Sequence, residues 1–182
     1  MESIMSGNPK ENLDDTPPLT TAGIPEYKQN VEFFYEEVNA QNPYTKAMRF
    51  CSTTEVKIPK DEFNHDTEVR MLIHTPEGCK EILESPCIIN AHGGGGIGGS
   101  PELEEPFCSF IAHENNVVVF NIDYRLAGSG AKVNQAAMDV VTAIKHIRKN
   151  AEKYLIDPDK ICLYGFQGGG YIMSAACTLL AM

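Results

Sequence analysis

At 182 residues, the chain has the length of one domain or of part of a larger one. Hydrophobic residues make up 42% of it, with 15 Gly and 11 Pro, which is ordinary for a globular α/β protein. The formal net charge of −10 argues against nucleic acid as a partner, because phosphate binding requires a basic surface, and it disfavours anionic membranes.

The sequence also lacks the signals of secretion and of membrane insertion. The N-terminus is polar and acidic, unlike a signal peptide, and no apolar run approaches the roughly 20 residues of a membrane span. The six cysteines form no Cys-x-x-Cys pair, and Cys87 and Cys162 lie in apolar runs, which favours buried free thiols over disulfides. We therefore expect a cytoplasmic protein without a membrane span.

The first 45 residues are predicted to form a segment separate from the globular core, which comprises residues 46–182. Residues 1–28 are rich in Pro, Asn, Asp and Thr, which indicates a flexible lead-in. Over residues 29–41, apolar side chains at i, i+3, i+4 and i+7 predict one amphipathic helix that stops before Pro43. These apolar positions are Val31, Phe34, Tyr35 and Val38.

Two kinds of strand follow. Residues 49–59 and 67–76 are predicted strands, and the second places Val69, Met71 and Ile73 at alternate positions, as in an outer strand with a partly exposed face. Three later runs are short and continuously apolar, which is typical of strands buried on both faces of a sheet: 87–91, 117–120 and 161–164.

An amphipathic helix is predicted over residues 106–115, with Phe107, Phe110 and Ile111 on one side, and another over residues 133–150. The apolar stripe of the second consists of Val133, Ala137, Val140, Val141, Ile144 and Ile147. A last helix is predicted to begin near Gly169 and to be still running at Met182. Buried strands that alternate with helices predict an α/β fold, with a mostly parallel sheet and helices on both faces. The last strand would carry an uncovered edge, which native domains avoid. We therefore expect the sheet to be continued by a missing C-terminal half or by a partner chain; a compact domain of five strands is the alternative.

A glycine-rich loop, INAHGGGGIGGS, includes the end of the first buried run. Gly94, Gly96 and Gly99 match the Gly-x-Gly-x-x-Gly dinucleotide fingerprint, but so glycine-rich a run matches many patterns, and the next helix begins well beyond the loop. A second interpretation is a flexible crossover without further function. A third is an oxyanion hole, in which backbone N–H groups converge on one point and His92 braces the loop.

A second glycine cluster, in ICLYGFQGGGYI, lies between the last apolar run and the last predicted helix. A strand that enters a helix through a tight Gly-x-x-x-Gly turn is where many hydrolases carry a nucleophilic serine. Here Gly165 and Gly169 frame the turn, and Gln167 occupies its middle. Two such loops, one supplying N–H donors and the other a nucleophile turn, are more specific together than either is alone.

On these residues the sequence resembles the α/β-hydrolase fold family, in particular the hormone-sensitive-lipase-like and arylacetamide deacetylase-like carboxylesterases. The resemblance rests on HGGG at 92–95, DYRLA at 123–127, DPDKI at 157–161 and GFQGGGYI at the turn, in this order. It covers roughly residues 45–182 as an incomplete hydrolase core, whereas residues 1–45 resemble the N-terminal cap segment of the family. It implies hydrolysis of carboxylic esters of small or lipophilic acids, without a cofactor or a metal.

The resemblance also implies a role for each matching residue. Gly93 and Gly94 would donate two N–H groups to the oxyanion, and Gly168, which follows the nucleophile position, would donate the third. Gln167 stands at the nucleophile position itself. Asp123 and Arg125 would tie the segment after the fourth strand to its surroundings. The supporting residues would be His92, Gly95, Gly165 and Gly169.

Two departures from the family predict that this chain is inactive. The family carries serine where Gln167 stands, and a carboxamide cannot be activated by histidine to attack an ester. The acid and the histidine of the family follow the nucleophile, whereas all five histidines of this chain precede Gln167: His65, His74, His92, His113 and His146.

Three functions therefore remain open. The chain is an inactive or partial carboxylesterase, a non-catalytic binder of a small lipophilic ester or acid, or a protein-interaction module. In the second case, the Gln167 amide would serve as a hydrogen-bonding group at the pocket floor. In the third case, the open edge of the sheet would accept a strand from another chain.

Overall fold

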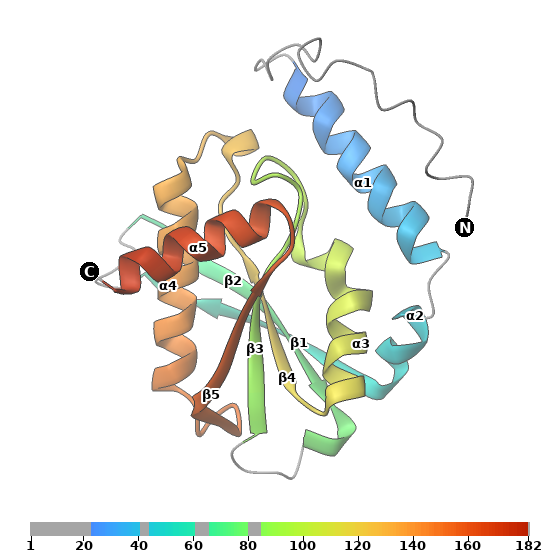
Figure 1. The fold of residues 1–182 in the computed structure, drawn as a ribbon, viewed down its shortest axis with the longest axis vertical. Helices are drawn as coiled ribbons and strands as arrows, with labels where there is room; N and C mark the ends of the chain where they lie inside the picture. Colours follow the sequence, from blue (N-terminus) through green and yellow to red (C-terminus); the bar gives the residue numbers. More distant parts are fainter. Residues whose placement is uncertain (1–22, 41–43, 61–65, 80–84, 182) are drawn as a thin grey trace.

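The computed structural model describes residues 23–40, 44–60, 66–79 and 85–181, which build one five-stranded sheet with helices on both faces (Figure 1). The strand order is β1-β2-β4-β3-β5. β2 runs antiparallel to both of its neighbours, and the other four strands share one direction, which confirms the expected mostly parallel α/β sheet. The strands are β1 (Cys51–Ile58), β2 (Val69–Pro76), β3 (Ser85–Ala91), β4 (Val118–Asp123) and β5 (Ile156–Gly165).

The helices divide between the two faces of the sheet. α4 and α5 pack on one face, over the larger hydrophobic cluster, and α3 packs with α2 on the other face (Figure 1). The α-helices are α1 (Ile24–Ala40), α2 (Tyr44–Ala47), α3 (Glu105–Asn115), α4 (Val133–Lys149) and α5 (Gly168–Leu180). Short 3-10 helices are η3 (Met48–Phe50), η4 (Glu77–Cys79), η5 (Pro101–Glu104) and η6 (Ala127–Ser129).

Strand periodicity explains the two cores. Along β4, Val118, Phe120 and Ile122 point to the larger cluster, and Val119 points to the smaller one beneath α3. α4 presents the predicted stripe to the larger cluster, except that Val133 at its start is 42% exposed. On α3, small residues approach the sheet, whereas the predicted Phe107, Phe110 and Ile111 are only half-buried; the buried set is Pro106, Cys108, Ser109 and Ala112.

The position of β2 contradicts the prediction of an outer strand. β2 lies between β1 and β4, and most of its side chains are buried, because α3 and α4 cover it from opposite faces. The polar residues of β2 do not face open solvent. Arg70 is half-buried and forms ion pairs, and His74 is buried against α3, where it contacts Ser109. β1 is the outer strand on this side of the sheet, with most of its residues exposed.

β5 also differs from the prediction of a strand buried on both faces. Ile161 and Leu163 pack against the larger cluster, but Cys162 and Tyr164 on the other face are exposed. On that face, the Tyr164 ring lies 5.8 Å from the ring of Phe107 on α3. The expected burial of the Cys162 thiol is therefore wrong, whereas Cys87 is buried, and burial raises the pKa of its thiol to about 12. The expected open edge is confirmed within the described strands, since β5 pairs only with β3.

The helix predicted over residues 29–41 begins earlier, at Ile24, so the last residues of the expected flexible lead-in are helical. Pro25 suits the first turn of a helix, which accounts for this start. Only Tyr35 of the predicted apolar stripe is buried, because α1 lies on the outside of the molecule beside the glycine loop (Figure 1). Residues 1–22 and His65 lie outside the described residues.

α5 begins at Gly168 and ends at Leu180, whereas the sequence predicts a helix that still continues at Met182, a residue outside the described part of the chain. The boundary at residue 45 between an N-terminal segment and a core stays a prediction. No described helix combines the length and the hydropathy that spanning a bilayer requires.

His74 is a fully buried histidine in the middle of the sheet. Its Nδ1 atom lies 3.3 Å from the hydroxyl oxygens of both Thr53 and Ser109, and its Nε2 atom has no hydrogen-bond partner among the described residues. Burial lowers the pKa of this imidazole to about 4. The folded chain therefore holds His74 neutral, whereas in the unfolded chain it takes up a proton near its ordinary pKa of about 6.5.

This difference predicts a loss of stability in acid. The contribution of neutral His74 is complete above about pH 6.5 and falls as the pH drops toward 4, by up to about 3 kcal/mol. Urea unfolding at pH 7 and pH 4 measures it. The free energy of unfolding of the His74→Gln variant should fall less than that of wild type, whereas a His113→Gln variant at the exposed end of α3 should follow wild type. Equal falls in wild type and His74→Gln would contradict the assignment.

Candidate functional site

The glycine loop after β3 depends on backbone conformations that glycine adopts readily. Gly94, Gly95, Gly96 and Gly99 all have positive φ angles, between 64° and 112°. The N–H groups of residues 97 and 98 both donate to the carbonyl oxygen of Gly94, and the N–H of Ala127 donates to that of Gly96. α3 begins only at Glu105, beyond the loop. A dinucleotide site needs the N-terminus of a helix inside the loop to bind the pyrophosphate, so the structure does not support the dinucleotide interpretation.

The turn from β5 into α5 has the geometry of a nucleophile turn. Gln167 adopts φ 48° and ψ −113°, a sparsely populated conformation for a residue with a side chain. A Cβ atom on Gly165 would lie 2.6 Å from the backbone of Gly169, and one on Gly169 would lie 1.9 Å from the carbonyl oxygen of Ala91. Glycine at both framing positions is therefore a steric requirement of the turn.

The two glycine turns meet. A Cβ atom on Gly168 would lie 2.5 Å from the Cα of Gly95 and 2.6 Å from the backbone nitrogen of Gly96. The structure thus brings together the predicted residues Gly94, Gly168 and Gln167. Among the described residues, the N–H groups of Gly94, Gly95 and Gly168 have no hydrogen-bond acceptor. Free backbone donors at such a junction are suited to an anion or a polarised carbonyl oxygen.

Gly93 behaves differently from its predicted role as an oxyanion donor. Its N–H donates to the carboxylate of Glu104 at 2.7 Å, so this donor is already occupied. The predicted supporting residue Gly95 has the free N–H instead. Sequence reasoning missed Glu104, because one acidic residue near the start of a helix carries no pattern that distinguishes it from a solvated one.

His92 lies at the base of the glycine loop, fully buried. Its Nδ1 atom lies 2.8 Å from the carbonyl oxygen of Gly93, and its ring stacks on Tyr124 with 4.4 Å between centroids. Tyr124 in turn donates its hydroxyl proton to the carbonyl oxygen of His92 at 2.6 Å. Burial lowers the pKa of His92, which favours a neutral ring that donates from Nδ1. These contacts support the bracing role expected for His92.

A pocket of about 240 Å³ lies between α1 and the turn at Gln167. Its wall is mostly apolar and aromatic and contains no histidine among the described residues. The lining residues are Tyr27, Asn30, Val31, Phe34, Tyr35, Gly94, Phe166 and Gln167. Apolar walls with a few polar groups are typical of small-molecule sites. No group of three or more His, Cys, Asp or Glu side chains in the described part of the chain is arranged to hold a metal ion.

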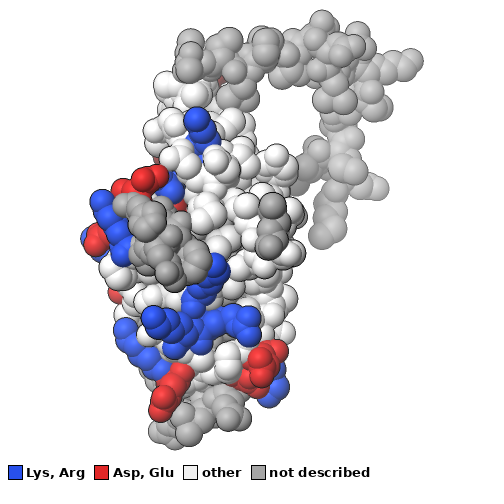
Figure 2. All heavy atoms as spheres, turned by 90° about the vertical axis from the view of Figure 1, so that its left-hand side faces the viewer, with Lys and Arg blue, Asp and Glu red and all other residues white. Residues whose placement is uncertain are grey.

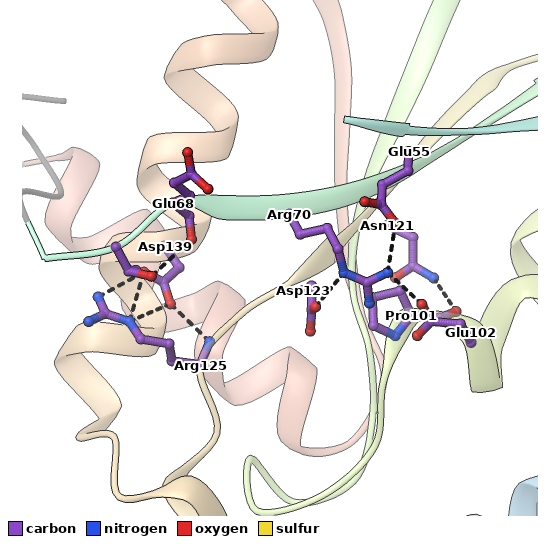
Figure 3. Close-up of polar contacts among 10 residues, drawn as sticks. Glu55, Glu68, Arg70, Pro101, Glu102, Asn121, Asp123, Arg125 and Asp139 are labelled. Atoms are coloured by element: carbon purple, nitrogen blue, oxygen red, sulfur yellow. Dashed lines mark hydrogen bonds and ion pairs between the residues drawn. The ribbon is translucent and has the colours of Figure 1, made fainter. Parts of the chain in front are cut away.

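Asp123 and Arg125 lie outside this pocket, in ion pairs (Figure 3). Arg125 contacts the buried carboxylate of Asp139 on α4 through its Nε and Nη2 atoms and its backbone N–H, at 2.8–3.1 Å. Asp123 pairs with Arg70, which also contacts Glu102. The hydrogen bond from Arg70 lowers the pKa of Glu102 to about 2. These contacts tie the segment after β4 to its neighbours, in agreement with the expected structural role.

Positive charge gathers on another face. Figure 2 shows Lys and Arg side chains on the side where α4 ends, and the last turn of α4 carries Arg148 and Lys149. Arg148 lies 4.0 Å from the carboxylate of Asp159 at the exposed start of β5. Asp and Glu side chains also appear on this face (Figure 2), and the end of α4 lies far from the glycine loop after β3 (Figure 1).

Comparison with known proteins places this geometry in a family. The sequence profile of the alpha/beta hydrolase fold matches residues 88–182, more than half of the chain and both glycine turns. The chain belongs to the α/β-hydrolase fold family. The match confirms the α/β-hydrolase fold expected from the sequence.

Proteins similar to this chain include several named esterases. An arylesterase from Saccharolobus solfataricus is 37% identical over 71% of this chain and 39% of its own length. Neutral cholesterol ester hydrolase 1 from Pongo abelii is 30% identical over 68% of this chain and 30% of its own length. The solved structure of a bacterial heroin esterase superposes with a TM-score of 0.77 at 25% identity, over 93% of this chain and 50% of that one. The chain thus spans about half the length of that esterase, or less than half for the other two.

Steric exclusion at the junction gives a direct prediction. Gly169→Ala should lower the free energy of unfolding by roughly 2 kcal/mol or more, because its Cβ would overlap the Ala91 carbonyl oxygen at 1.9 Å. Gly170→Ala is the matched control on the same helix. Its Cβ would meet only the Gly165 carbonyl at 3.0 Å, and the helix propensity of alanine offsets this contact to within about 1 kcal/mol. Thermal unfolding of both variants measures the difference, and equal stability would contradict the close approach.

Proposed function

We propose that this chain is a non-hydrolytic member of the carboxylesterase-like α/β-hydrolases, with Gln167 at the nucleophile position. The observation that carries the proposal is the placement of Gln167. It has the strained backbone of a nucleophile turn, it is the N-terminal cap of α5, and it lines the pocket beside Gly94. A serine in this place would offer a hydroxyl nucleophile, whereas the Gln167 carboxamide has no group that attacks an ester.

The environment of Gln167 supports the same proposal. No histidine lines the pocket among the described residues, and the four described histidines are held elsewhere. His74 is buried in the sheet and His92 beneath the glycine loop. His113 on α3 stacks on Phe50, and His146 on α4 contacts Tyr154. None of them forms a hydrogen bond with Gln167, so the described part of the chain supplies this position with no general base.

As a second proposal, the pocket binds a ligand without hydrolysing it. The support for this proposal is the set of backbone N–H groups that have no acceptor among the described residues. Gly94, Gly95 and Gly168 would present N–H groups to a carbonyl or carboxylate oxygen, and Gln167 would add a carboxamide that both donates and accepts. Phe34 and Phe166 line the same pocket and would contact the apolar part of the ligand. The ligand class is a small lipophilic ester or acid, bound without a cofactor.

The open edge of β5 favours a further alternative, an interaction module. Within the described sheet, β5 has a partner on one side only, and Cys162 and Tyr164 are exposed beside that edge. A strand added to this edge, from this protein or from another, would satisfy the free backbone groups of β5.

Ester hydrolysis tests the main proposal. The 182-residue chain should release no p-nitrophenol from p-nitrophenyl acetate above the rate without protein, with the S. solfataricus arylesterase as the positive control. Gln167→Ser should also be inactive in this chain, because a hydroxyl without a histidine base stays a poor nucleophile. Wild-type activity that a serine-directed inhibitor abolishes would contradict the proposal, and activity gained by Gln167→Ser would show that a base is present.

A further inference from the structure

The side chain of Glu104 is a buried carboxylate that three elements of the fold share. Glu104 is 3% exposed, and no Lys or Arg among the described residues pairs with it. Its oxygens accept hydrogen bonds from the Gly93 N–H at 2.7 Å, from Asn90 Nδ2 at 2.9 Å and from the Tyr35 hydroxyl. A buried carboxylate without a counter-ion is costly unless donors surround it, so these three hydrogen bonds are what keeps Glu104 in place.

We propose that Glu104 is a positioning residue that both fixes the glycine loop and holds α1 over the pocket, so that the docking of α1 and the geometry of the loop are coupled. This inference rests on the proposed function for its ligand, since it assigns Glu104 to the same pocket. The hydrogen bonds that carry it are independent of that function.

α1 has one buried side chain, and Tyr27 and Lys28 on the same helix also lie beside Gly95 and Gly98 of the glycine loop. Tyr35 is the one buried residue of α1, whereas Phe33 and Phe34 are 62% and 53% exposed. Asn39 donates from Nδ2 to the carbonyl oxygen of Leu103, the residue before Glu104. Burial, reinforced by the Glu104 carboxylate, raises the pKa of Tyr35 above its usual value, so its hydroxyl remains a donor. A helix that buries so little apolar surface opens at low cost unless such hydrogen bonds close it.

Glu104 fixes the glycine loop through its hydrogen bond with Gly93. The Gly93 N–H donates to Glu104, and the Gly93 carbonyl oxygen accepts from His92. Fixing residue 93 at both its N–H and its carbonyl sets the direction of the following peptides, whose N–H groups at Gly94 and Gly95 face no described acceptor. Further along the loop, only backbone hydrogen bonds to the carbonyl oxygens of Gly94 and Gly96 add to this hold among the described residues, because the glycines have no side chains.

Polar side chains beneath the loop hold the carboxylate itself. Asn90, near the end of β3, also donates to Asn121 Oδ1 at 3.0 Å. Asn121 donates to the carbonyl oxygen of Pro101 at 2.9 Å (Figure 3). Pro101 begins η5, the short helix that ends at Glu104. The position of Glu104 is therefore set by the sheet, and α1 and the glycine loop are set by Glu104.

Hydrogen exchange on the 182-residue chain tests this coupling without any ligand. Glu104→Gln should speed amide exchange roughly tenfold or more in both segments 24–40 and 92–99, because it removes the charge and one acceptor. Tyr35→Phe should speed exchange in 24–40 to a similar extent and in 92–99 less. Tyr171→Phe, which removes an exposed hydroxyl from α5, is the control and should change neither segment. In the double variant Glu104→Gln/Tyr35→Phe, the increase in the exchange rate of segment 24–40 should be smaller than the product of the increases in the two single variants.

Glu104→Met separates hydrogen bonding from space filling, since methionine has a similar volume and accepts no strong hydrogen bond. It should speed exchange in both segments at least as much as Glu104→Gln, while α4 stays protected and confirms a folded core. Exchange like wild type in either Glu104 variant, or a change confined to one segment, would overturn the inference. If neither Glu104 variant folds, Tyr35→Phe decides it, and unchanged exchange in 24–40 would overturn it.

Binding of phenyl butyrate, followed by calorimetry, relates the positioning role to the pocket. Glu104→Gln should weaken this affinity about tenfold, roughly the effect of losing one well-placed hydrogen bond, whereas Tyr171→Phe should leave it unchanged. Unchanged affinity in Glu104→Gln would overturn the positioning role. Failure of wild type to bind the probe would count against the proposed binding function alone, because the exchange experiment still decides the coupling.

Discussion

The backbone of the turn after β3 touches the backbone of the turn after β5, and this contact places the candidate site. β3 and β5 are adjacent parallel strands, with Ala91 opposite Gly165 at their ends, so both turns leave the same edge of the sheet. Gly168 then lies against Gly95 with no room for a Cβ atom. The glycines are required here for close approach as much as for their positive φ angles, which explains why the site needs so many of them in two short segments.

The strain at Gln167 persists because its surroundings fix the turn from both sides. β5 is paired with β3 up to Gly165, and α5 is anchored in the larger core by Ile172, Met173 and Ala176. Together they impose on residue 167 a conformation that a side-chain-bearing residue adopts rarely. In the proposed function, this turn presents the Gln167 amide to the pocket, where an active esterase would present a reactive hydroxyl. This combination is the physical basis for proposing a hydrolase scaffold that binds without hydrolysing.

The sequence predicted those parts of the fold in which burial follows a period. α4 is an example: Val140, Val141, Ile144 and Ile147 mark the buried face, and the helix has the expected bounds within one residue. The same reasoning failed for β2, because a period of two says which faces are polar but not which strands lie beside it. It also failed for α1, where Phe34 completes an apolar stripe and yet lies 53% exposed. The role of Glu104 could not be predicted from the sequence, because its partners Tyr35 and Gly93 are 69 and 11 residues away and only the tertiary fold brings them together.

Intact-protein mass spectrometry after incubation with a fluorophosphonate tests most directly whether the turn at Gln167 can form a covalent intermediate. A fluorophosphonate modifies an activated serine and leaves a carboxamide unchanged. We predict that the mass of the 182-residue chain stays that of the unmodified protein, with the S. solfataricus arylesterase as the control for reagent activity. A single adduct on the chain, located by peptide mapping to a residue of the pocket, would contradict the claim that this hydrolase scaffold has lost its nucleophile.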